Sequence, residues 1–293
     1  MRKRTLGIAL IITVAAVGAV VAAAWQLARP VPATIGVPPA NLGAEAVSFP
    51  SESGSTIHGW FVPAELPRAA VLLLPSVRAN RLSMVRRAEF LKAAGYATLL
   101  IDFQATGESP GDAITFGWRE RHDVLAAERF IRERVRGVPL GVIGSSLGGA
   151  AALLATPPLN AQALILEAVY PSIDMAVENR LRIRVGGVAP ALAPLLLWQL
   201  PARIGARREQ LRPVDHLPMV RCPVLVIGGS ADRHTTEADT RRLYAAAMEP
   251  KELWLLPDVA HVDFLDAAGA AYRNRVLAFL QQAFGVRHAI VRR

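Results

Sequence analysis

Short apolar runs recur along the chain, and longer segments with spaced apolar residues separate most of them. The runs lie at residues 70–74, 97–101, 139–143, 163–166, 224–227 and 253–256. Segments with helical spacing lie at 83–94, 119–135, 147–155, 237–247 and 267–284. Continuous apolar strands that alternate with helices predict an α/β fold, with a mostly parallel sheet covered by helices on both faces.

Two further segments depart from this alternation. Residues 44–49 and 57–62 flank a turn rich in Ser and Gly, which predicts an antiparallel hairpin. The connection at 170–216 is unusually long and contains an uncharged stretch at 185–202. Glycines and prolines interrupt this stretch, and a membrane span here would separate strands of one sheet. We therefore predict a small, apolar helical cap or lid at 170–216.

The N-terminus has the composition of a membrane segment. Three basic residues at positions 2–4 precede residues 5–28, none of which is charged. About 20 apolar residues cross a bilayer, so the pattern predicts a transmembrane helix. The basic flank places the N-terminus in the cytoplasm and the remaining chain on the periplasmic or extracytoplasmic side. Ala22, Ala23 and Ala24 resemble a signal-peptidase site, so secretion after cleavage of a signal peptide is the alternative.

Four parts of the chain follow from these patterns. Residues 1–28 form the anchor or signal, and residues 29–43 form a proline-rich spacer. Residues 44–285 form the catalytic domain, which includes the cap at 170–216. Residues 286–293 form a basic tail.

Composition excludes several classes of protein. Hydrophobic residues make up 52% of the 293 residues and charged residues 19%, which is too apolar for a disordered chain. The lone Cys222 excludes an intramolecular disulfide and a cysteine-based zinc cluster. The net charge is +9, but the arginines are scattered among acidic neighbours. Solvated helix faces account for this pattern better than nucleic-acid binding, so we expect no nucleic-acid partner.

One motif predicts a nucleophile. Gly144, Ser146 and Gly148 fit the pattern G-x-S-x-G, directly after the apolar run at 139–143 and before a segment rich in Ala and Leu. A strand, a tight turn and a helix in this order hold a serine hydroxyl at an exposed elbow. We therefore predict Ser146 as the nucleophile, whereas Ser145 would face away.

A serine nucleophile needs a base, and the base needs an orienting carboxylate. His261 follows the run at 253–256, and Asp232 follows the run at 224–227. Both therefore stand at carboxyl ends of strands, where catalytic groups of open α/β sheets gather. Asp174 is the rival acid, and His234 is a poor base because it shares the loop of Asp232.

The chain order Ser146, Asp232, His261 resembles that of the α/β-hydrolase family. Residues 102–111 (DFQATGESPG) look like the family's loop after the fourth strand. Residues 74–77 (LPSV) occupy the place of its oxyanion loop, although Pro-Ser replaces the usual His-Gly. The resemblance implies an α/β-hydrolase fold with a cap, and an oxyanion hole made by the amides of Val77 and Leu147. Within the family, the chain is similar to the esterase-like and serine-aminopeptidase-like branches of bacterial hydrolases.

These parts predict a serine hydrolase without a cofactor or a catalytic metal. The anchor and the apolar cap favour small esters or thioesters with an apolar part. An aminopeptidase-like activity on amides is an alternative, but the cap is basic and a substrate amine would need acidic partners. A catalytically inactive binding protein of the same fold is the other alternative.

Overall fold

The computed structural model describes residue 18, residue 22 and residues 25–290, and it describes side chains up to residue 285. Its centre is an eight-stranded sheet with the order β10-β9-β8-β7-β4-β5-β3-β2. The strands are β2 (Glu45–Pro50), β3 (Thr56–Val62), β4 (Ala69–Leu74), β5 (Tyr96–Ile101), β7 (Leu140–Ser145), β8 (Ala163–Glu167), β9 (Val224–Gly229) and β10 (Lys251–Leu256). Strands β2 and β3 form the predicted antiparallel hairpin, β3 pairs antiparallel with β5, and the other neighbours are parallel.

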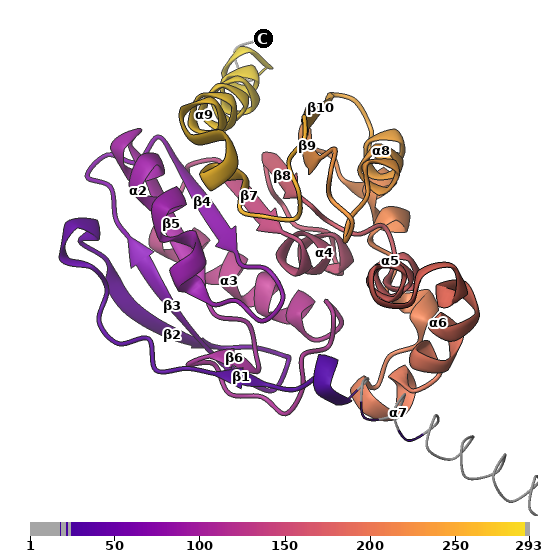
Figure 1. Ribbon diagram of the computed structural model, residues 1–293. Coiled ribbons are helices and arrows are strands. Elements are labelled where there is room, and N and C mark those ends of the chain that lie inside the picture. The colour runs from indigo at the N-terminus through magenta and orange to yellow at the C-terminus, as the bar shows by residue number, and fades with distance from the viewer. Residues whose placement is uncertain (1–17, 19–21, 23–24, 291–293) are drawn as a thin grey trace, which may run out of the picture.

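Helices cover both faces of this sheet (Figure 1). One hydrophobic cluster joins the sheet to α3 (Glu120–Arg134), α4 (Leu147–Leu154) and α8 (Glu237–Ala246). A second cluster joins the opposite face to α2 (Val85–Ala93) and α9 (Phe264–Ile290). The mostly parallel, doubly covered sheet that the apolar runs predict is therefore confirmed.

The segment at 170–216, which we call the cap segment, is helical. It contains α5 (Ile173–Val185), α6 (Ala189–Leu197) and α7 (Leu200–Ile204), with short 3-10 turns between and after them. A third apolar cluster joins these helices to Ala28 and Leu154. The uncharged stretch is broken at Gly186, where the chain enters the turn Gly186–Val188.

The proline-rich segment at 29–43 lies against the domain. Strand β1 (Val31–Pro32) pairs in parallel with β6 (Thr106–Gly107). Glu108 accepts hydrogen bonds from the amides of Ile35 and Gly36, at 3.0 and 3.2 Å. These contacts bind the segment along its length, a feature that its composition does not reveal.

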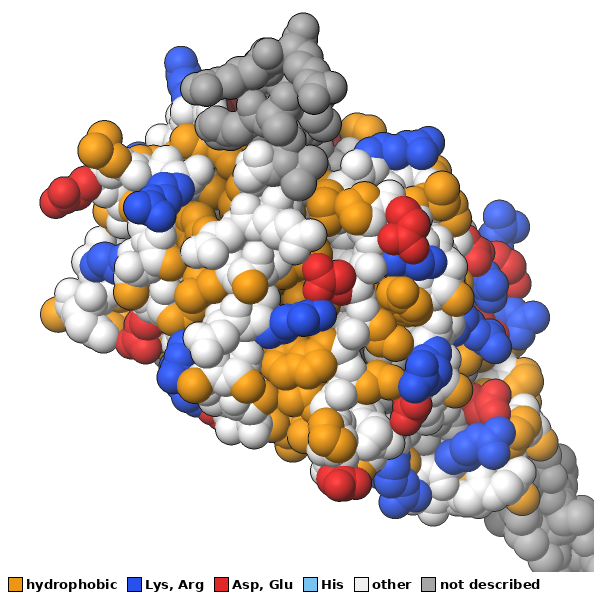
Figure 2. Space-filling view, turned by 90° about the horizontal axis from the view of Figure 1, so that it is seen from above, with side chains coloured by type: hydrophobic (Ala, Val, Ile, Leu, Met, Phe, Trp, Pro, Cys, Tyr) orange, Lys and Arg blue, Asp and Glu red, His pale blue; other side chains and the backbone are white. Residues whose placement is uncertain are grey.

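Most of the predicted N-terminal membrane helix, residues 5–28, lies outside the described residues. None of the helices in the described part of the chain is both long and apolar enough to cross a bilayer. At the other end, α9 continues through residues 286–290 of the predicted basic tail, and residues 291–293 are outside the described part. On the face shown in Figure 2, basic and acidic side chains are interspersed, so this face offers no surface of a single sign.

Candidate active site

The three predicted catalytic residues lie just beyond the carboxyl ends of parallel strands. Ser146 follows β7, Asp232 follows β9, and His261 follows β10. Because β10, β9, β8 and β7 are consecutive and parallel, these three positions lie at the same edge of the sheet. This is the edge where open α/β sheets place their ligands.

Ser146 lies at a strained turn between β7 and α4. Its φ of 46° and ψ of −106° are unusual for a residue with a side chain, and glycines make room for the turn. A Cβ atom at Gly144 would lie 2.5 Å from the Cα of Gly149, and one at Gly148 would collide with the carbonyl of Leu74. The Ser146 amide donates to the Glu167 carbonyl at 2.7 Å, which ties the turn to β8.

The Ser146 hydroxyl is buried and has no hydrogen-bond partner among the described residues. The structure therefore does not join Ser146 to His261 by a hydrogen bond. In hydrolytic enzymes such contacts are often long without substrate and tighten when it binds.

Asp232 and His261 are joined directly. The Oδ2 atom of Asp232 lies 2.6 Å from the Nδ1 atom of His261. The Oδ1 atom of Asp232 accepts the amides of His234 and Thr235, at 2.7 and 2.9 Å. Since both oxygens have fixed partners and the side chain is buried, the carboxylate holds the imidazole in one orientation.

The rival residues occupy other positions. Asp174 lies on α5, where its carboxylate is 3.4 Å from Arg208. The ring of His234 lies 5.0 Å from that of His261, centroid to centroid. Burial lowers the pKa of the His234 imidazole, and His261 and Arg180 lower it further, whereas Asp232 opposes the shift.

An apolar pocket of about 150 Å³ opens beside this edge of the sheet. Val77 and Leu147, the two predicted oxyanion residues, both line it. The Leu147 amide is in the first turn of α4, where a helix has no carbonyl to accept it. Most of the other lining residues come from the cap segment and from residues 27 and 28.

Several of these lining residues were missed by sequence reasoning. Leu27 and Ala28 belong to the predicted membrane segment, and Phe116 belongs to a loop without a motif. Tyr170 donates a hydrogen bond to the Phe116 carbonyl at 2.9 Å, and burial raises the pKa of its hydroxyl. Only the apolar character of the cap segment, seen in the sequence, pointed to this pocket.

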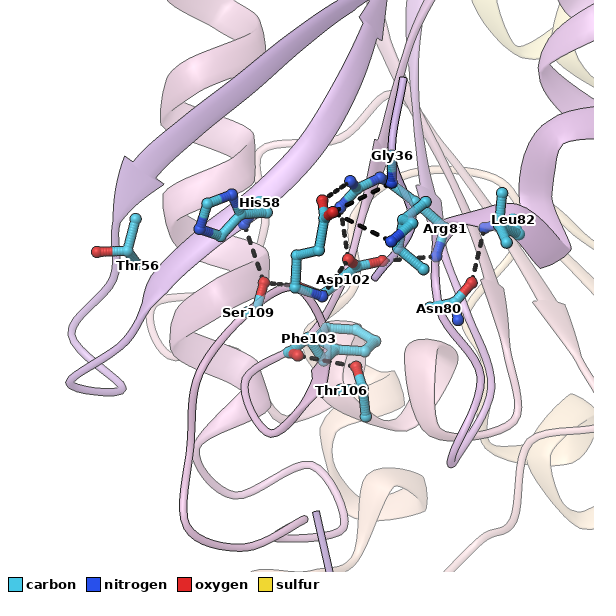
Figure 3. A network of polar contacts seen from close by, with 12 residues as sticks. Gly36, Thr56, His58, Asn80, Arg81, Leu82, Asp102, Phe103, Thr106 and Ser109 are labelled. Atoms are coloured by element: carbon cyan, nitrogen blue, oxygen red, sulfur yellow. Dashed lines mark hydrogen bonds and ion pairs between the residues drawn. The ribbon is translucent and has the colours of Figure 1, made fainter. Parts of the chain in front are cut away.

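Asp102, in the loop at 102–111, contacts Arg81 (Figure 3), which lies four residues after Val77 in the chain. Asp102 accepts the Arg81 amide at 2.7 Å and forms a buried ion pair with the Arg81 guanidinium at 2.5 Å. Ser109 donates to the Asp102 carbonyl at 2.8 Å and accepts the His58 amide at 2.9 Å. Burial raises the pKa of Asp102, although hydrogen bonds and Arg81 oppose this shift. The motif residues of this loop therefore support the site from behind rather than lining the pocket.

A buried ionic network around Arg87 supports the loop that carries His261. Arg87 on α2 pairs with Glu167 at 2.8 Å and with Asp263 at 2.7 Å, and its Nε donates to the Tyr272 hydroxyl at 3.0 Å. Burial alone would lower the pKa of Arg87, but Glu167, Tyr272 and Asp263 together raise it well above its usual value. Asp263 is two residues from His261, so Arg87 links β8 to the His261 loop.

Loss of this arginine should destabilise the protein strongly. In Arg87→Met the buried Glu167 carboxylate loses its cation, and we expect the free energy of unfolding to fall by about 3–5 kcal/mol. Urea denaturation followed by circular dichroism measures the change. The control is Arg86→Met, which removes an exposed pair with Asp266 and should cost less than about 1 kcal/mol. Equal losses in the two variants would contradict this account of the network.

The model of the α/β-hydrolase family matches residues 56–275 of the chain. The chain belongs to this family. The match includes the elbow, the Asp232 loop and His261. The segment that pairs with β6 and the first strand of the central sheet, β2, precede the match.

Two bacterial relatives and one solved structure show how far the similarity to known proteins extends. YfhR of Salmonella typhimurium is 27% identical over 259 residues, which cover 85% of each chain, and it is described as uncharacterized. YqkD of Bacillus subtilis, also described as uncharacterized, is 26% identical over 80% of this chain and 78% of its own. The esterase Pf2001 of Pyrococcus furiosus superposes with a TM-score of 0.72 at 20% identity, over 88% of this chain and 98% of its own. At 20% identity, this similarity shows that the two proteins share a fold.

Proposed function

We propose that this α/β hydrolase cleaves carboxylic esters or thioesters with an apolar part, through an acyl-enzyme on Ser146. The observation that carries the proposal is the 2.6 Å contact between His261 Nδ1 and Asp232 Oδ2, at the sheet edge where Ser146 occupies a strained elbow. The apolar pocket beside it contains both predicted amide donors. No step requires a cofactor.

The proposed reaction has two halves. His261 Nε2 takes the Ser146 proton as Oγ attacks the substrate carbonyl carbon, and the amides of Val77 and Leu147 stabilise the oxyanion by about 3–4 kcal/mol per donor. The carbon–oxygen or carbon–sulfur bond then breaks, and the imidazolium gives the proton to the leaving alcohol or thiol. Water, deprotonated by His261, attacks the acyl-enzyme, which releases the acid and returns the proton to Ser146.

The pocket favours apolar acyl or alcohol groups. Its walls are mainly aliphatic and aromatic side chains, many of them from α5, α6 and α7. Trp198 is 78% exposed and Leu195 is 51% exposed, so the cap segment also presents apolar surface outward. These features support a cap that acts as a lid over the site, and the fold of an esterase from Pyrococcus furiosus is consistent with ester hydrolysis.

Two alternatives have less support. An aminopeptidase would need a carboxylate to bind the substrate amine, and the described residues that line the apolar pocket include no Asp or Glu. Glu167 and Asp263 line a second cavity that contains His261, but both are paired with Arg87. A catalytically inactive binding protein would not need a buried, doubly hydrogen-bonded carboxylate on His261.

Active-site labelling tests the proposal. A fluorophosphonate probe should label the full-length protein, and heat-denatured protein should remain unlabelled. Unlabelled samples of a preparation that reacts with the probe should hydrolyse p-nitrophenyl acyl esters in preference to aminoacyl p-nitroanilides. Absence of labelling would indicate that the protein is a catalytically inactive binding protein. A preference for anilides would indicate an aminopeptidase.

We also propose that the N-terminal segment anchors the protein in the inner membrane with the catalytic domain outside the cytoplasm. This proposal rests on the uncharged residues 5–28 and the basic residues at 2–4. Alkaline phosphatase fused after Val37 should be active, and green fluorescent protein fused there should be dark. The protein should stay in the membrane fraction after a carbonate wash. A bright fluorescent fusion would contradict the orientation, and a soluble chain beginning near Trp25 would indicate signal cleavage.

A further inference from the structure

The pocket beside the elbow combines apolar walls with three arginines. Arg78, Arg180 and Arg203 all line it, and none of the described lining residues is acidic. A guanidinium that is taken out of water without a counter-charge costs free energy, so proteins usually pair it. The placement of these arginines therefore needs a reason.

Arg180 is a pocket arginine that interacts electrostatically with Asp232. It lies on α5 and is half-buried, and its Nη1 donates to the Ala176 carbonyl at 3.0 Å. No carboxylate forms an ion pair with it in the described part of the chain. Burial lowers the pKa of its guanidinium, and nearby Tyr170 and Asp232 act in the opposite direction. A guanidinium has five N–H donors, so most of those of Arg180 are available to a ligand.

The other two arginines of the pocket also bind neutral groups. Arg78 donates to the carbonyls of Gln26 and Arg29, both at 3.4 Å. Arg203 lies over the ring of Trp25 at 3.9 Å, and its buried Nε has no hydrogen-bond partner among the described residues. Both arginines therefore add positive charge to the pocket.

Some arginines of the cap segment outside the pocket are paired. Three of them have carboxylates within ion-pair distance: Arg182 with Glu178 at 2.5 Å, Arg208 with Asp174 at 3.4 Å, and Arg212 with Asp215 at 2.7 Å. The segment thus has acidic residues, but they lie outside the pocket. Arg184 and Arg207 have no ion pair in the described part of the chain either, but both are exposed to water and need none, so the missing partner is costly only in the pocket.

We propose that Arg180 binds an anionic group of the substrate, so that the enzyme prefers esters whose apolar part carries a carboxylate or phosphate. The inference rests on the proposed hydrolase function. A planar guanidinium matches the two oxygens of a carboxylate or phosphate and binds them bidentately. The aliphatic walls accommodate the part of the substrate between its anionic group and the scissile carbonyl. Arg78 and Arg203 add to the positive electrostatic potential of the pocket and so favour the same anionic group. Arg180 is then a specificity-determining residue.

Matched ester pairs test this inference by turnover. Mono-p-nitrophenyl suberate has a terminal carboxylate, and its terminal methyl ester is the neutral partner with the same chain. The full-length protein should favour the anionic ester by about tenfold or more in kcat/KM, mainly through KM. A terminal phosphonate analogue should be favoured in the same way if the charge, rather than the carboxylate shape, is recognised.

Variants assign the preference to one side chain. In Arg180→Met the ratio of kcat/KM for the anionic over the neutral ester should fall to about one, and Arg180→Lys should restore part of it. Arg184→Met is the control, because Arg184 is exposed on the same helix and does not line the pocket; this variant should keep the wild-type ratio. A wild-type ratio at or below one, or a ratio that Arg180→Met leaves unchanged, would overturn the inference.

A binding measurement separates this inference from the proposed activity. Calorimetric titration of Ser146→Ala with monooctyl suberate and with its neutral methyl ester measures anion preference without turnover. Anion preference that is lost in Ser146→Ala/Arg180→Met supports the inference, even if the wild-type protein fails to hydrolyse any ester. Equal affinity for the two compounds would overturn it, even if ester hydrolysis and fluorophosphonate labelling succeed.

Discussion

Ser146→Ala should lower the hydrolysis of p-nitrophenyl esters by at least about 10³-fold and should abolish fluorophosphonate labelling. The variant lacks the only oxygen at the elbow that the proposed reaction can acylate, whereas the amides of Val77 and Leu147 remain. Some acceleration over water should therefore persist. Initial rates at saturating ester, with the labelled band followed on a gel, measure both effects.

Ser145→Ala is the matched control. Ser145 is the last residue of β7, and its side chain lines a separate cavity together with Glu167 and His261. We expect this variant to keep most of its activity and all of its labelling. If Ser145→Ala were inactive and Ser146→Ala active, the elbow would be out of register by one residue.

Asp232→Asn should lower kcat by about 10⁴-fold, because the carboxamide would hold the wrong tautomer of His261. The backbone amides of His234 and Thr235 require an acceptor at Oδ1, so the amide oxygen of the new side chain takes that position. The amide NH₂ then faces Nδ1 of His261, which must accept a hydrogen bond rather than donate one. In the neutral imidazole, Nε2 carries the proton and cannot act as the base for Ser146.

The pH profile distinguishes this effect from a simple loss of structure. Asp232→Asn should keep its unfolding midpoint within a few degrees and gain activity when hydroxide replaces the base at high pH. The control is Asp174→Asn, which removes a half-exposed partner of Arg208 and should leave kcat almost unchanged. A severe loss in Asp174→Asn with a mild loss in Asp232→Asn would indicate that Asp174, on the cap segment, is the carboxylate that orients His261.

The local parts of the site could be predicted because each depends on neighbours in sequence. The apolar run before Ser146, the glycines around it and the Ala/Leu-rich segment after it determine the elbow within a few residues. His261 and Asp232 could be placed because each follows a recognisable strand by a short turn. The strand order, which places β10 next to β9, then makes their contact possible.

The long-range parts could not be predicted, because no local pattern encodes them. The parallel pair between β1 and β6 joins residues more than 70 positions apart, and its two-residue strands are too short for any periodicity. The same holds for Arg87, whose partners Glu167 and Asp263 are 80 and 176 residues away. A basic helix such as α5 is expected to face solvent, and only the packing of the cap segment turns Arg180 toward a pocket.

The fastening of residues 25–36 to the domain determines where the protein can be shortened. Ile114 donates to the Ala28 carbonyl and Val31 donates to the Ala105 carbonyl, both at 2.8 Å, and Leu27 and Ala28 form part of the pocket wall. A soluble version that begins at residue 44, where the catalytic domain starts by sequence, would therefore lack one side of its own binding site. Cleavage after Ala24 would instead leave that wall intact, so an anchored enzyme and a secreted one beginning at Trp25 would have the same pocket.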